Sequence, residues 1–359
     1  MAVTWRMTTC PAEGVGRYGG RSAAAPGEKE GRGLIEVRGL TKRYGDTLAV
    51  SDLSFDVPPG MVTGFLGPNG AGKSTTMRAI VGLDRPTSGS VRVNGHRYVQ
   101  DRAPLTEVGA LLEARSVHPG RSAFNHLLFL AHSNGIGRNR VREVLELVGL
   151  DGVARKRAGG FSLGMGQRLG MAAAILGDPA TLLFDEPVNG LDPEGIIWVR
   201  TLLKSFAAQG RAVLVSSHLM AEMALTADRL VLIGQGRLIA DTTISEFVRQ
   251  ASGQRVQVRS SDQARLAKAL EVSGGQVSDG ESGALRVDGL SAPAIGQAAY
   301  DLGIVVHELV ALEASLEEAF MAMTADSVQF HGHLGAGAGP TPPTANAQAS
   351  AQVGAGSEN

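Results

Sequence analysis

A glycine-rich loop, Gly67-Pro-Asn-Gly-Ala-Gly-Lys-Ser74, carries the clearest chemistry in this sequence. It fits the pattern G-x-x-x-x-G-K-[ST] at every fixed position. Glycines let the backbone turn its N–H groups toward one anion, and a helix that follows adds its positive N-terminal end. Lys73 is expected to reach the terminal phosphates of ATP, and the Ser74 hydroxyl is expected to bind Mg²⁺. The residues predicted to contact the nucleotide in this loop are Gly67, Pro68, Asn69, Gly70, Ala71, Gly72, Lys73, Ser74 and Thr75.

A pair of acidic residues follows a short apolar run about 110 residues further on. The run Thr181–Phe184 has the length of a buried strand, and Asp185-Glu186 comes directly after it. Parallel strands present their carboxyl ends at the edge of the sheet where open α/β folds bind ligands. We therefore expect Asp185 to bind the metal and Glu186 to act as the general base that orients the attacking water. The alternative is a solvated strand end without a catalytic role.

His218 follows a second run of this kind, Ala212–Val215, and Ser216-Ser217. A lone histidine is more often structural than catalytic. At the carboxyl end of a strand, however, it could reach the γ-phosphate.

The elements around these residues alternate between strand and helix. Strand patterns are present at Leu34–Arg38, Ser51–Val57 and Met61–Leu66, and helical patterns at Thr75–Gly82, 121–150, Gln167–Leu176 and Gly195–Gln209. The alternation predicts an α/β fold with a mostly parallel sheet. After Arg249, strand patterns at 255–259, 284–288 and 304–309 alternate with helical patterns at 264–272 and 292–302. They predict a small α+β appendage.

The composition and charge of the chain exclude several classes of protein and partner. The 359 residues are 43% hydrophobic, carry a formal net charge of −1 and include a single cysteine. A near-neutral chain has no global field to attract nucleic acid, so no nucleic-acid partner is expected. One cysteine cannot form a disulfide within the chain. We find no apolar run of the roughly 20 residues needed to span a bilayer, and no secretory signal pattern.

These motifs, in this order, resemble the ATP-binding cassette (ABC) transporter ATPases over about residues 34–248. Phe161-Ser-Leu-Gly-Met-Gly-Gln-Arg168 resembles the family's signature segment and keeps Ser162 and Gly164, while Leu163 and Met165 replace the commoner Gly and Gln. Gly190-Leu-Asp192 resembles the D-loop, and His218 fits the switch histidine that contacts the γ-phosphate. Tyr44 fits the aromatic residue that stacks on adenine, or it simply packs.

The resemblance implies a P-loop NTPase cassette with a mostly parallel core sheet, an antiparallel β subdomain and an α-helical subdomain. It also implies that Ser162, Gly164 and Asp192 serve the ATP of a second cassette, in a head-to-tail dimer that is expected to be a homodimer. Glu113 stands where the family usually has the Q-loop glutamine. It is predicted either to be a ligand of Mg²⁺ or to be a surface residue of that loop.

The end of the chain resembles a narrower group. Leu309–Phe320 is similar to the ending of the cassettes of bacitracin- or daunorubicin-resistance exporters, which pair with separate membrane permeases. We therefore predict a motor subunit that hydrolyses ATP, lies peripherally on the cytoplasmic side of the cell membrane and works with a permease that exports drugs or antibiotics. The alternative is a soluble ABC ATPase of translation or repair. The predicted domains are a disordered extension (1–33), the cassette (34–248), the appendage (249–326) and a disordered tail (327–359).

Overall fold

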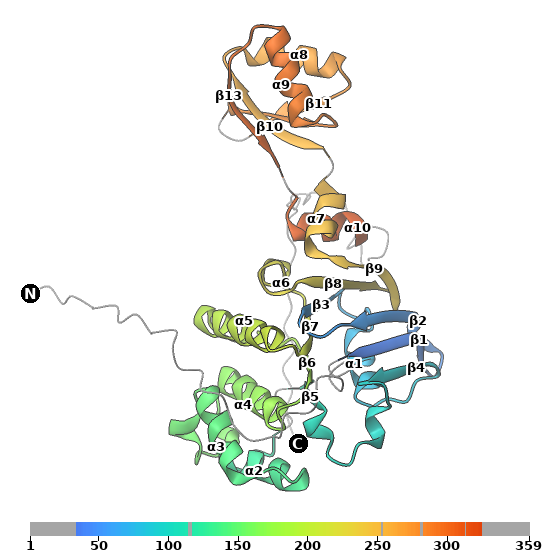
Figure 1. The fold of residues 1–359 in the computed structure, drawn as a ribbon, viewed down its shortest axis with the longest axis vertical. Coiled ribbons are helices and arrows are strands. Elements are labelled where there is room, and N and C mark those ends of the chain that lie inside the picture. Colours follow the sequence, from blue (N-terminus) through green and yellow to red (C-terminus); the bar gives the residue numbers. More distant parts are fainter. Residues whose placement is uncertain (1–33, 114–116, 253, 281–282, 313, 325–359) are drawn as a thin grey trace, which may run out of the picture. The chain divides into compact units, whose positions relative to one another are not determined.

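The computed structural model describes residues 34–113, 117–252, 254–280, 283–312 and 314–324. The predicted disordered segments, 1–33 and 327–359, lie outside these residues. At the centre is a six-stranded sheet (Figure 1) with the order β5-β6-β7-β3-β8-β9, in which only β9 runs antiparallel. Its strands are β3 (Val62–Leu66), β5 (Val108–Leu111), β6 (Thr181–Asp185), β7 (Ala212–Ser217), β8 (Arg229–Gly234) and β9 (Arg237–Thr243).

The central strands β6 and β7 each contain an unbroken apolar run because their side chains feed two cores. In β6, Leu182 and Phe184 belong to one buried cluster, whereas Leu183 between them belongs to another. Successive side chains of a strand point to opposite faces, so a sheet covered on both faces needs an unbroken apolar run. This explains why Thr181–Phe184 and Ala212–Val215 could be recognised as buried parallel strands.

Helices cover one face of this sheet. The helices in and around the first core are α2 (Ala123–Ser133), α3 (Arg138–Leu147), α4 (Leu163–Ile175), α5 (Pro193–Ala208), α6 (Met220–Thr226) and α7 (Ile244–Ser252). The predicted helical region 121–150 is thus two helices, and Gly135, with a φ of +68°, lies in the break between them. The arrangement agrees with the α-helical subdomain that the resemblance implied.

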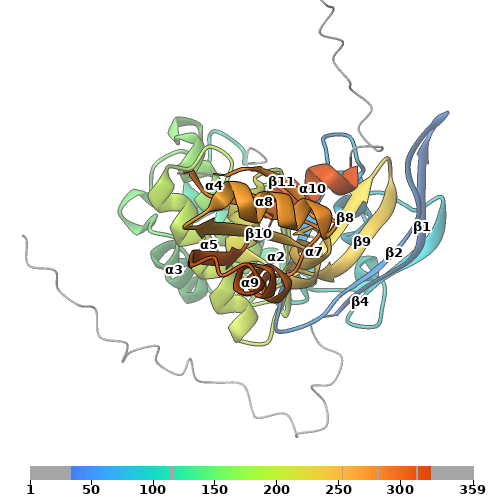
Figure 2. The ribbon, with the colours of Figure 1, turned by 90° about the horizontal axis from the view of Figure 1, so that it is seen from above.

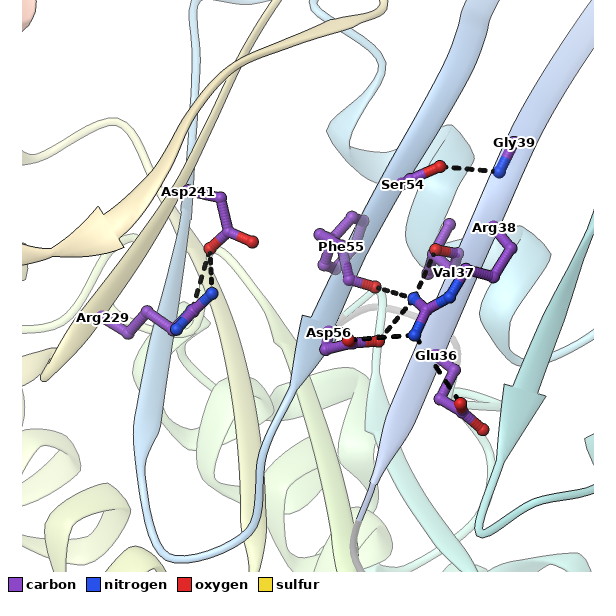
Figure 3. Close-up of polar contacts among 9 residues, drawn as sticks. All are labelled: Glu36, Val37, Arg38, Gly39, Ser54, Phe55, Asp56, Arg229 and Asp241. Atoms are coloured by element: carbon purple, nitrogen blue, oxygen red, sulfur yellow. Dashed lines mark hydrogen bonds and ion pairs between the residues drawn. The ribbon is translucent and has the colours of Figure 1, made fainter.

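The other face packs against α1 (Lys73–Ile80) and an antiparallel sheet of three strands, β2-β1-β4. These strands are β1 (Ile35–Tyr44), β2 (Thr47–Val57) and β4 (Ser88–Val93), and β2 lies next to β9 (Figure 2). Arg38 of β1 donates to both carboxylate oxygens of Asp56 in β2, at 2.5 and 3.0 Å, and Arg229 pairs with Asp241 across β8 and β9 (Figure 3). Such solvated pairs contribute at most about 1 kcal/mol each, so the apolar core holds this layer in place.

A second compact fold follows β9 and α7. Its sheet has the order β11-β12-β10-β13, all antiparallel, and shares a separate core with α8 (Gln263–Val272) and α9 (Ala292–Asp301). The strands are β10 (Arg255–Ser260), β11 (Gln276–Asp279), β12 (Leu285–Asp288) and β13 (Val306–Ala311). The order β-α-β-β-α-β is that of ferredoxin-like folds, and it agrees with the predicted α+β character.

The last described helix, α10 (Leu316–Thr324), packs against α7. Its Leu316, Ala319 and Phe320 are buried in the same cluster as Phe247 of α7. The predicted boundary between a cassette ending at residue 248 and an appendage reaching residue 326 stays a prediction. Within the described residues, no helix is both long and apolar enough to span a bilayer.

Candidate nucleotide-binding site

The glycine-rich loop joins the end of β3 to the start of α1, at the carboxyl edge of the central sheet. Gly72 is the N-cap of α1, with a φ of +101°, and a Cβ there would lie 2.7 Å from the carbonyl oxygen of Ala49. Gly70 has a φ of +81°, and a Cβ there would meet nothing within 4 Å. Gly72 is therefore required by packing, whereas Gly70 leaves open space over the loop.

The loop also lines a pocket of about 240 Å³. Eight predicted site residues line it together with Ala49, which the sequence did not single out: Asn69, Gly70, Gly72, Lys73, Ser74, Thr75, Asp185 and Glu186. The first N–H groups of a helix have no partner within the helix, so those at the start of α1 are available to an anion. The structure thus brings the loop and the acidic pair to one cavity.

Lys73 is held at the base of the loop. The residue is 7% exposed, and its Nζ donates to the carbonyl oxygens of Gly67 at 2.7 Å and Pro68 at 3.2 Å. Burial lowers the pKa of the ammonium group, and the nearby carboxylates of Glu186 and Asp185 act in the opposite direction. Keeping the buried Lys73 ammonium group charged costs free energy. The negative charge of bound nucleotide phosphates would offset this cost, so it favours their binding.

The acidic pair is fixed by neighbours from β7 and the loop after it. The Ser216 hydroxyl donates to Asp185 Oδ1 and accepts the backbone N–H of Glu186 at 2.9 Å. His218 Nδ1 lies 2.7 Å from Glu186 Oε2. An ionised carboxylate can only accept, so Nδ1 carries the hydrogen. A phosphate oxygen is also an acceptor, so Nε2 can bind one only in the imidazolium form, in which both ring nitrogens donate. The structure therefore places His218 against the predicted base.

The oxygen donors here suit Mg²⁺. Ser74 and Asp185 line the pocket, and both also line a neighbouring groove together with Glu113. Mg²⁺ binds hydroxyl and carboxylate oxygens and keeps several waters, so it needs few protein ligands. Over the described ranges, no three His, Cys, Asp or Glu side chains form a group that could hold a metal ion.

Tyr44 lies beside the pocket at the end of β1 and is 45% exposed. Its hydroxyl donates to Asp84 Oδ2 at 2.7 Å, and Lys42 lies over the ring, 4.7 Å from its centre. Burial raises the pKa of Tyr44, as does Asp84, whereas the hydroxyl of Thr75 lowers it. Thr75, which lines the pocket, thus lies near the Tyr44 hydroxyl, and the stacking of the ring on adenine stays a prediction.

The signature segment lies outside the phosphate pocket and lines another cavity, of about 440 Å³. Ser162 is the N-cap of α4, and its hydroxyl accepts the N–H of Met165 at 3.3 Å. Asp192 caps α5 in the same way, accepting from the N–H of Gly195 at 2.9 Å. A Cβ on Gly164 would lie 3.2 Å from Leu191, so the signature and D-loop segments pack together.

Sequence comparisons agree with this geometry. A sequence profile described as "ABC transporter" matches residues 50–189, and a profile for a domain of unknown function matches residues 254–317. The bacitracin transport ATP-binding protein of Enterococcus faecalis is 39% identical over 217 residues, which are 60% of this chain and 70% of that protein. The chain belongs to the ABC transporter family.

Two further relatives extend the match. The daunorubicin resistance ATP-binding protein of Streptomyces coeruleorubidus is 32% identical over 305 residues, covering 81% of this chain and 96% of that protein. A solved ATP-binding subunit of an ABC transporter is 29% identical with a TM-score of 0.56, over 60% of this chain and 92% of its own. As a member of this family of ABC ATPases, the chain binds and hydrolyses ATP.

Proposed function

We propose that this chain is the ATP-driven motor subunit of an exporter of drugs or antibiotics and that it works with a separate permease. The observation that carries the proposal is the pocket in which Lys73, Ser74, Asp185 and Glu186 meet. The relatives named for bacitracin transport and daunorubicin resistance support the class of cargo.

In the proposed mechanism, the loop from Gly67 to Thr75 binds the phosphates and Lys73 neutralises the terminal ones. Ser74 and Asp185, with Glu113 beside them, would hold Mg²⁺, which neutralises charge on the phosphates. Glu186 orients the attacking water and takes its proton, and His218 Nε2 contacts the γ-phosphate. Tyr44 stacks on adenine. The oxygen ligands at the pocket and the Glu186–His218 contact support these roles.

A second cassette completes the proposed site. The start of α4 is a helix N-terminus, where N–H groups and the positive end of the dipole favour phosphate. Lys73 and its loop already serve this chain's own nucleotide, so Ser162, Gly164 and Asp192 would act on the ATP of a partner cassette. An isologous pair of this chain would then enclose two nucleotides.

We assign the permease contact to the groove that contains Glu113. It has a volume of about 590 Å³ and is lined mainly by apolar side chains, including Leu83, Leu112 and Leu130. His126 also lines it, and its buried Nδ1 has no hydrogen-bond partner within the described part of the chain. An apolar groove with one unmet polar group suits a helical segment of a permease. Docking there would place the subunit on the cytoplasmic side of the membrane.

The Glu186→Gln variant tests this function. Glutamine keeps the shape of the side chain but cannot take a proton, so we expect ATP binding and dimer formation with hydrolysis stopped. The assay is ATP turnover together with size-exclusion chromatography in ATP. Glu146→Gln, an exposed carboxylate of α3, is the control and should behave like the parent protein. Normal turnover by Glu186→Gln would refute the assignment of the base.

A further inference from the structure

Two buried side chains outside the predicted set contact the loop that carries Glu186. Ser216 of β7 is 0% exposed and Gln167 of α4 is 6% exposed. They come from segments about 50 residues apart in the sequence, and they contact the two peptide units that flank the Cα of Glu186.

Ser216 holds the amino side of Glu186. Its hydroxyl oxygen accepts the Glu186 N–H at 2.9 Å while its hydrogen goes to Asp185 Oδ1. A hydroxyl has one hydrogen and two lone pairs, so it can make both bonds at once. Ser216 therefore holds the backbone of Glu186, the predicted base, in a fixed position relative to the carboxylate of Asp185, the predicted metal ligand.

Gln167 holds the carbonyl side. Its Nε2 donates to the carbonyl oxygens of Glu186 at 3.5 Å and Asn189 at 3.3 Å. Both partners are acceptors, so the amide nitrogen must be the atom that faces them. The amide oxygen, in contrast, is buried without a partner among the described residues. Burying an acceptor that has no hydrogen-bond partner destabilises the folded state. A core residue with no other role could avoid this cost by being apolar.

Glu186 itself has an unfavourable backbone conformation. Its φ is +50°, in the left-handed region that residues other than glycine rarely adopt. Such a conformation persists where the surroundings hold it in place, and it is concentrated at functional sites. The bonds to the N–H and C=O of Glu186 supply that restraint, and His218 restrains the end of the side chain.

We propose that Ser216 and Gln167 are positioning residues for ATP hydrolysis, which hold Glu186 in the conformation that aims its carboxylate at the attacking water. The proposal rests on the proposed role of Glu186 as the base. Gln167 lies on α4, five residues after Ser162, so it also links the signature segment to the loop of the base within one chain.

The test uses Ser216→Ala and Gln167→Met in the full chain. Methionine has the length of glutamine but no N–H donor. Displacement of the base by a fraction of an ångström to about 1 Å slows the reaction by about 10- to 100-fold. We therefore expect kcat to fall by that factor in each variant. The KM for ATP and the rise in melting temperature produced by ATP should stay unchanged, and both variants should form an ATP-dependent dimer that persists as in Glu186→Gln.

Thr226→Val is the matched control, because it removes another buried hydroxyl, one that donates to the carbonyl oxygen of Glu222 at 2.7 Å. It should keep the parent kcat. Parent kcat in Ser216→Ala and Gln167→Met would overturn the proposal, and so would a parallel loss of kcat and ATP affinity, which indicates a general loss of structure. If Ser216→Ala does not fold, Gln167→Met still decides. Active Glu186→Gln would instead show that the proposed role of Glu186 is wrong.

Discussion

Replacing Gly70 with alanine should fill the space above the phosphate loop while costing the loop little stability. Gly70 has a φ of +81°, and an added Cβ would meet no atom within 4 Å. Gly70 lines the pocket that we assign to the phosphates, so we expect an added methyl group to take up space that a phosphate needs. We expect Gly70→Ala to fold and to lose nucleotide binding.

The expected cost in stability is the cost of a left-handed alanine alone, about 1 kcal/mol. This corresponds to a fall of about 2–4 °C in melting temperature for a domain of this size. Gly135→Ala is the matched control, because Gly135 also has a positive φ, of +68°, and open space around its Cβ, but lies in the break between α2 and α3. Gly72→Ala should lower the melting temperature further, because its Cβ would lie 2.7 Å from the Ala49 carbonyl oxygen.

Thermal melts with and without Mg·ATP measure both effects. At 100 times its Kd, a ligand stabilises the folded state by about 2.7 kcal/mol, which raises the melting temperature by about 5–10 °C. The parent protein and Gly135→Ala should show this rise, and Gly70→Ala should not. A full rise in Gly70→Ala would refute the placement of the phosphates over Gly70.

Two further substitutions test the adenine contact and the second fold. Tyr44→Ala should weaken ATP binding about 10-fold through loss of base stacking, as measured by calorimetry. Tyr44→Phe keeps the ring and should bind like the parent, although it loses the bond to Asp84; equal affinity in all three proteins would exclude stacking. Leu266→Ala, at a fully buried site in the core of β10–β13, should destabilise that fold by about 2–5 kcal/mol and leave ATPase activity intact. A matching loss of ATPase activity would argue against a separate domain.

The parts of the fold that local patterns determine were predictable. Buried strands such as Thr181–Phe184 are marked by their own apolar residues, and the phosphate loop is marked by its glycines and Lys73. The predicted helical region 121–150 was too coarse, although Gly135 and Gly137 were a usable signal for the break. The packing of α10 on α7 joins segments on either side of the second fold, so no local pattern could show it.

The sequence indicates candidate residues for the site but not the contacts that restrain them. The sequence indicated Asp185, Glu186 and His218 because each follows an apolar strand. The sequence does not single out Ser216, which follows the apolar run Ala212–Val215, although its place two positions before His218 puts it at the same edge of the sheet. The contact of Gln167 with Glu186 and the positive φ of Glu186 depend on how α4 packs, which spacing alone does not determine.

Isothermal titration calorimetry with Mg·ATP and this chain tests the central assignment most directly. We expect saturable binding with one nucleotide per chain, and loss of this binding in Lys73→Ala, which removes the buried cation at the base of the pocket. Absence of binding to the parent protein, or equal binding to Lys73→Ala, would contradict it.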